Sequence, residues 1–152
     1  MKFLLILLAL LAPSAVLAQG DVALASEVFV ERVVTDSQGK QSIVREEPKV
    51  VTPGDRIVVV ISYQNKGAAP KTGFELTNPI PDAVSFSEAD SGASVSADGG
   101  KSWGALAALK VKQPDGTTRA AAPADVTHVR WSFAQPIAPG NKGEKSFRGI
   151  VK

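Results

Sequence analysis

Few residues of this chain could carry out chemistry. His128 is the single histidine, and the absence of cysteine excludes thiol nucleophiles, thiolate metal sites and disulfide bonds. Catalysis by a serine would need a histidine and an orienting carboxylate to converge on it, and no nucleophile-elbow pattern is present. We therefore expect no enzyme activity, with a hydrolase that uses His128 as a remote alternative.

The acidic residues offer no clearer catalytic or metal site. Glu46 and Glu47 would point to opposite faces of an extended chain, so they could not act together on one bond. Asp82, Glu88 and Asp90 are expected to be surface charges, and no calcium-loop pattern occurs. We predict no cofactor and no metal ion.

Residues 96–103 (SADGGKSW) fit the S-x-D-x-G-x-x-W pattern, the "Asp box" of sialidase-like propellers. The pattern predicts a hairpin turn in which Asp98 accepts backbone amides, Gly100 takes a positive φ and Trp103 packs beneath the loop. The box occurs once, and a propeller of several four-stranded blades cannot fit in a chain of this length. We expect a structural turn, with Asp98 and Trp103 as the candidate interaction residues.

Aromatic side chains suggest a second function. Trp103, Trp131 and Tyr63 could form a platform on which a sugar stacks, which would make the protein a glycan- or small-ligand-binding module. Two of the three lie on predicted strand faces among other apolar residues, which favours burial in the core. Exposure of Trp103 would distinguish the two possibilities.

The first 18 residues have the parts of a secretory signal peptide: a positive charge at Lys2, an apolar run, and small residues before a cleavage point between Ala18 and Gln19. The apolar run stops at Pro13, short of the roughly 20 residues that span a bilayer. We expect an exported mature chain, periplasmic or extracellular, without a membrane span. Without Lys2 it has 16 basic and 15 acidic residues, so its charge does not indicate a nucleic-acid partner.

Short strands must position all of these residues. Residues 56–64 are apolar on both faces, which predicts a central strand, and residues 127–133 alternate with Trp131 inward and His128 outward. Further strands are predicted at 27–34, 43–45, 72–77, 84–87, 106–112, 117–120 and 147–151. The fold class is therefore all-β: an antiparallel β-sandwich of about 7–10 strands, in a single domain over residues 19–152.

Three stretches carry a family resemblance. Residues 51–67 (VTPGDRIVVVISYQNKG) contain a V-x-P-G-D turn and a strand that ends in Tyr-x-Asn-x-Gly, and residues 78–86 place an Asn-Pro-x-Pro turn before a strand. Residues 136–151 match the last turn and strand. Over roughly residues 48–152 the chain resembles the "conserved repeat domain" (domain of unknown function eleven) of bacterial exported and surface proteins.

The resemblance implies an immunoglobulin-like sandwich outside the cytoplasm, and it supplies no active site. Residues 21–47 precede the match and are expected to form an N-terminal hairpin that adds strands to one sheet. We expect a non-enzymatic structural or protein-interaction module at the bacterial cell envelope. Its partner, an envelope protein or a glycan, would add at edge strands near Pro79 and Pro81 or at the N-terminal hairpin.

Overall fold

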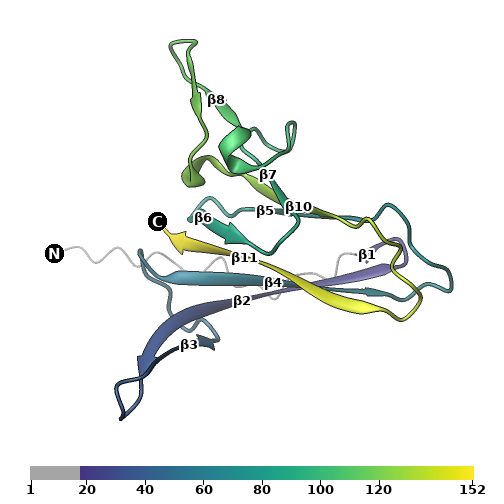
Figure 1. The fold of residues 1–152 in the computed structure, drawn as a ribbon, viewed down its shortest axis with the longest axis horizontal. Helices are drawn as coiled ribbons and strands as arrows, with labels where there is room; N and C mark the ends of the chain where they lie inside the picture. Colours follow the sequence, from purple (N-terminus) through teal and green to yellow (C-terminus); the bar gives the residue numbers. More distant parts are fainter. Residues whose placement is uncertain (1–17) are drawn as a thin grey trace.

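The computed structural model describes residues 18–152, so the predicted signal peptide lies outside the described residues except for Ala18. The chain is an antiparallel β-sandwich, which confirms the predicted fold class (Figure 1). The described residues form eleven strands, one more than the upper end of the predicted range.

The larger sheet has the order β1-β2-β4-β11-β6, with β3 also paired to β2. Its strands are β1 (Ala18–Gln19), β2 (Val22–Thr35), β3 (Gln41–Glu46), β4 (Arg56–Asn65), β6 (Val84–Ala89) and β11 (Lys142–Val151). The β2–β3 hairpin, predicted as an extension over residues 21–47, is thus part of this sheet, and it curves away from the sandwich at its turn (Figure 1).

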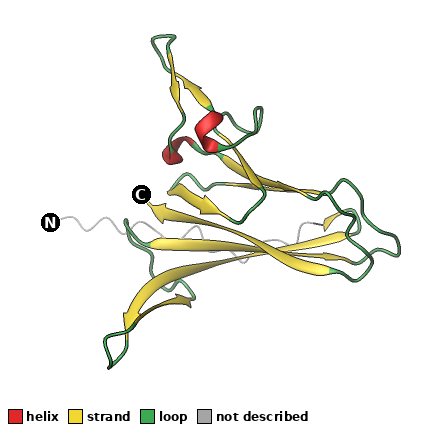
Figure 2. Ribbon diagram, viewed as in Figure 1, coloured by secondary structure: helices red, strands yellow, loops and turns green. Residues whose placement is uncertain are grey.

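The smaller sheet has the order β5-β10-β7 and faces the larger one. It consists of β5 (Glu75–Pro79), β7 (Ala93–Ser96) and β10 (His128–Ser132). A two-stranded hairpin, β8 (Lys110–Lys112) and β9 (Thr118–Ala120), projects beyond it, and the 3-10 turns η1 (Leu106–Ala108) and η2 (Pro123–Asp125) lie at the base of that hairpin (Figure 2).

Apolar side chains from both sheets form one core. β4 contributes Ile57, Val59 and Ile61, whereas β10 contributes Val129 and Trp131, of which Trp131 is 2% exposed. The opposite face of β4 is buried too, as its two apolar faces predict for a central strand. Alternation therefore places every second side chain of β10 in the core and the others, including His128, on the outer side.

Asn65, the asparagine of the Tyr-x-Asn-x-Gly motif, is fully buried at the end of β4. Its Nδ2 donates to the carbonyls of Ile137 at 2.7 Å and Ala69 at 2.9 Å, and its Oδ1 accepts the N–H of Gly67. Gly67 must be glycine because a Cβ there would overlap the side chain of Asp21. The motif therefore joins three loops at one corner of the sandwich.

Every predicted strand has somewhat different bounds in the structure, and two of these differences have an identifiable cause. The strand predicted over residues 106–112 is extended and paired only from Lys110, because Leu106 to Ala108 form η1 with Leu106 and Leu109 packed against the core. The strand predicted over residues 72–77 begins at Glu75 and continues through Pro79. Proline is tolerated there because β5 is an edge strand, as expected for this segment.

Candidate functional site

The predicted turn at residues 96–103 is present, and the carboxylate of Asp98 holds it together. Oδ1 of Asp98 accepts three hydrogen bonds of 2.7–3.0 Å from the Ser96 hydroxyl and the backbone N–H groups of Lys101 and Ser102. These bonds, that from Ser102 foremost, hold the pKa of Asp98 well below its ordinary value of 3.8. The carboxylate of Asp98 therefore stabilises its own turn.

Trp103, the second candidate interaction residue, is half-buried, and both its Nε1–H and one face of its ring make contacts within the protein. Its Nε1–H donates to the carbonyl of Gly100 at 2.9 Å, where Gly100 has the predicted positive φ of 88°. The guanidinium carbon of Arg130 lies 4.1 Å from the ring centroid, a cation–π contact. A sugar that stacked on this face of the ring would have to displace Arg130.

His128 lies beside this turn on the outer face of the smaller sheet, as its place in the alternation predicts. Its Nδ1 is 3.0 Å from the hydroxyl of Thr127, and its ring meets the edge of Trp103 at 6.3 Å between centroids. Among the described residues, no carboxylate hydrogen-bonds to His128. The ring therefore has no orienting acid of the kind that a catalytic triad uses.

Glu31 is a buried carboxylate whose burial the sequence did not indicate. Its side chain is 4% exposed, and Nε of Arg148 lies 3.0 Å from both of its oxygens. Arg45 approaches it at 3.5 Å, and Glu88 flanks Arg148 at 3.6 Å. Hydrogen bonding to Glu31 raises the pKa of Arg148, and the four side chains form a structural ion-pair group that links β2, β3, β6 and β11.

Asp90 was expected to be a surface charge, and the structure corrects this. It is half-buried, and its two carboxylate oxygens accept the N–H and the hydroxyl of Ser146, at 2.6 and 3.0 Å. The bond ties the end of β6 to β11, so Asp90 has a structural role. The partner is 56 residues away in the sequence, which is why the local pattern did not reveal it.

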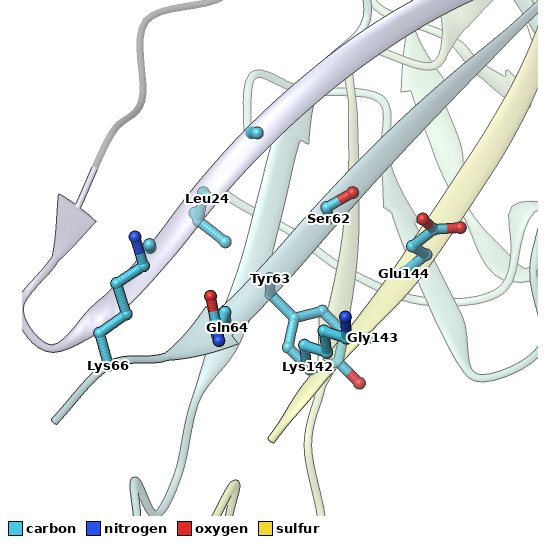
Figure 3. Close-up of a pocket in the computed structure, with 10 residues that line it drawn as sticks. Leu24, Ser62, Tyr63, Gln64, Lys66, Lys142, Gly143 and Glu144 are labelled. Atoms are coloured by element: carbon cyan, nitrogen blue, oxygen red, sulfur yellow. The ribbon is translucent and has the colours of Figure 1, made fainter. Parts of the chain in front are cut away.

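An open groove of about 660 Å³ lies across the ends of β2, β4 and β11 (Figure 3). Its lining includes the small side chains of Ala25 and Ser62 and the charged side chains of Lys66, Lys142 and Glu144. It contains no histidine and one carboxylate, so its lining supplies no acid–base pair. Within residues 18–152, no cluster of three or more His, Cys, Asp or Glu side chains could hold a metal ion.

The edge of β2 beside this groove is only partly covered. β4 pairs with one side of β2, and both β1 and β3 pair with the other side, opposite Val22–Ala23 and Val30–Thr35 respectively. No described residue pairs with this side of β2 between Leu24 and Phe29. Beyond the sandwich, the β2–β3 hairpin also exposes the cross-strand pair Val33 and Ile43, at 62% and 61%.

Comparison with known proteins finds no matching family model, no similar curated protein and no similar solved structure. The resemblance to the conserved repeat domain therefore rests on the motifs themselves. Across the described part of the chain, no helix is long and apolar enough to cross a membrane.

Proposed function

We propose that this chain is an exported, non-enzymatic β-sandwich of the conserved-repeat type that binds another protein at the bacterial cell envelope. The observation that carries the proposal is the side of β2 from Leu24 to Phe29, with which no described residue pairs. An unpaired strand edge attracts another strand, and proteins usually blunt such edges with charge, proline or a covering loop. Here the only charged side chain between Leu24 and Phe29 is Glu27, and the segment has no proline.

The candidate catalytic residues support a binding role because their side chains contact other parts of the fold. Asp98 and Asn65 hydrogen-bond to backbone groups, Asp98 within its turn and Asn65 at one corner of the sandwich. Asp90 and Glu31 bond to residues of β11 and so connect strands. His128 contacts a hydroxyl and an aromatic edge. The polar residues of the motifs thus have structural roles in the fold. The strand edges remain as the part of the surface that is suited to binding another chain.

Fractionation of a bacterial host that produces the tagged full chain tests export. We expect the chain in the envelope or medium with Gln19 as its first residue. The variant Ala18→Phe should keep the leader, because signal peptidase needs a small residue at this position. An unprocessed wild-type chain in the cytoplasm would contradict the proposal.

Crosslinking of the exported chain tests partner binding. A photoreactive residue at Ile43, on the exposed hairpin beside the open edge, should give an adduct with an envelope protein. The same residue at Lys112, exposed on β8 and distant from β2, is the matched control (Figure 1). A chain that stays free and monomeric, with no adduct from positions across the surface, would overturn the proposal.

A further inference from the structure

β3 is an edge strand with one side open. β2 pairs with it over its whole length, and among residues 18–152 no other strand does. All of its residues are exposed except the half-buried Val44. The hairpin curves away from the sandwich, and β3 is the strand of the pair that lies farther from β4 (Figure 1). Both ends of this edge lie within the described chain: the turn at residues 36–40, and Pro48, which has no N–H to continue a ladder.

The hydrogen-bond parity of the hairpin identifies the backbone groups that face the open edge. The N–H of Asp36 donates to the carbonyl of Lys40 at 3.0 Å, so this opposed pair is hydrogen-bonded, and every second pair along the hairpin is as well. Residues between these pairs direct their N–H and C=O groups away from β2. In β3 they are Gln41, Ile43 and Arg45.

The bonds between β2 and β4 give the same parity. The N–H of Lys66 donates to the carbonyl of Asp21, in register with the rest of this ladder, so the odd-numbered residues of β2 bond to β4. The even-numbered residues, among them Val30 and Val34, direct their backbone groups to the other side, where β3 lies. The assignment of the open edge of β3 therefore agrees with two independent ladders.

The sequence of β3 is self-complementary about Ile43. When two copies pair antiparallel around a two-fold axis at this residue, Ile43 meets its counterpart, and Val33, which is opposed to it in the hairpin, extends the row to four exposed apolar side chains. Lys40 then lies opposite Glu46 of the other copy, at both ends of the paired segment. Among the described residues Lys40 has no ion-pair partner, and Glu46 has only Arg32, at 3.4 Å.

The neighbouring registers lack this match. A pairing centred on Val44 would place Ile43 opposite Arg45, and a pairing centred on Ser42 would place Ile43 opposite Gln41. In both, an exposed apolar side chain faces a polar one, and the lysine no longer meets the glutamate. Of the three registers, the one centred on Ile43 is therefore the most favourable.

The two sandwiches do not collide in this register. The hairpin joins the sandwich at the end where Val30 pairs with Glu46, and its turn lies at the other end. Antiparallel pairing about Ile43 places the turn of each copy beside the Val30–Glu46 end of the other. The sandwiches therefore lie at opposite ends of the paired strands, which would span about 24 Å over residues 40–46.

We propose that the open edge of β3 binds a second copy of this chain, by antiparallel strand addition centred on Ile43. The product is a two-fold symmetric dimer with a four-stranded ladder in the order β2-β3-β3-β2. Main-chain bonds hold the strands together, and the apolar row and the two Lys40–Glu46 pairs fix the register. This dimer goes beyond the proposed function, and because its paired residues do not include Leu24–Phe29, it leaves that segment of β2 open.

Sedimentation equilibrium of the processed, exported chain tests the dimer, which should form with a dissociation constant below about 1 mM. Lys40→Glu and Glu46→Lys each place like charges opposite one another at both ends of the ladder, and each should weaken the dimer about tenfold. An equimolar mixture of the two variants brings opposite charges together again and should form a mixed dimer within about threefold of the wild-type affinity. High salt should reduce these differences. Denaturant unfolding checks that both variants are folded.

Because the chain has no cysteine, a single introduced one reports the register. Ile43→Cys brings the two sulfur atoms together across the axis, so oxidation by copper–phenanthroline should give a covalent dimer. Gln41→Cys, on the same exposed face, is the matched control, because its two copies are offset by about 14 Å along the strands, too far for a disulfide. The rate for Ile43→Cys should be about tenfold higher, and adding Lys40→Glu should reduce it.

Three results would overturn the dimer. They are a wild-type chain that stays monomeric at about 1 mM, a mixture of the charge variants that associates no more tightly than either variant alone, and equal disulfide rates for the two cysteines. A photoreactive residue at Ile43 would capture a second copy as well, and the mass of the adduct distinguishes it from an envelope protein. A monomeric chain that gives an envelope adduct would refute the dimer alone, whereas a dimer without such an adduct would contradict the proposed function alone.

Discussion

β10 and β2 both alternate inward and outward side chains, but they differ in how completely other strands pair with their two edges. Residues His128–Trp131 of β10 have a partner strand on both sides, β5 and β7. The middle of β2 pairs with β4 on one side, and no described residue pairs with it on the other. The polar side chains that looked most capable of chemistry surround β10, whereas the segment Leu24–Phe29 of β2 has Glu27 as its only charged side chain.

This difference is the basis of the proposed binding role. Around β10, the hydrogen-bonding and aromatic groups of the Asp98 turn satisfy one another, so a ligand there would have to break existing contacts. Along β2, the groups that face outward belong to the backbone and have no partner among the described residues. The proposed function therefore rests on an edge of β2 without a described partner and not on a side chain with catalytic potential.

Truncation of the core side chain of β10 should give the largest effect. Trp131→Ala removes a side chain that is 2% exposed, and we expect a loss of about 3–5 kcal/mol in the free energy of unfolding. Val28→Ala on the half-buried inner face of β2 should cost about 1 kcal/mol. Denaturant unfolding of both variants measures the difference. A loss below 1 kcal/mol for Trp131→Ala would mean that this face of β10 is not in the core.

Neighbouring prolines in β2 should distinguish its two edges. Ala25→Pro removes an N–H that bonds to β4 and should cost roughly 3 kcal/mol, because a buried carbonyl loses its donor and the ring crowds the neighbouring strand. Ser26→Pro places the ring on the open side and should cost less than about 1 kcal/mol. Equal losses in unfolding experiments would show that this side of β2 is covered in the folded chain.

The sequence predicted the parts of this comparison that depend on local pattern. Alternation assigned the two faces of β4 and of β10, and turn chemistry assigned the roles of Asp98 and Gly100. It could not predict that β1 and β3 pair with the same side of β2, with no described residue paired between them, because pairing depends on partners that the local pattern does not specify. The burial of Glu31 was missed for the same reason, since Arg148 is 117 residues away.

A close approach between strands gives a further test, in the strand on the far side of β4. At Gly149 of β11 an added Cβ would overlap the side chain of Val84 and lie 2.8 Å from the carbonyl of Ser85. Gly149→Ala should therefore cost about 1–3 kcal/mol through overpacking. Gly104→Ala, where the nearest atom would be 3.7 Å away, is the control and should cost little. Thermal unfolding of the pair would show whether β11 is as tightly enclosed as β10.

The carboxylates near β10 should also make that region more sensitive to acid than β2. Asp125, just before β10, is paired with Arg119 at 2.6 Å, and this bond together with the Ala122 N–H lowers its pKa from 3.8 to about 2. Because the folded-state pKa lies below the ordinary value, Asp125 stabilises the fold above pH 3.8, and this contribution is lost as the pH falls through about 2. Asp125→Asn should reduce stability at pH 6 and flatten its decline between these values. Urea unfolding at a series of pH values would measure this, and an unchanged decline would show that the Arg119–Asp125 pair contributes nothing to the acid response.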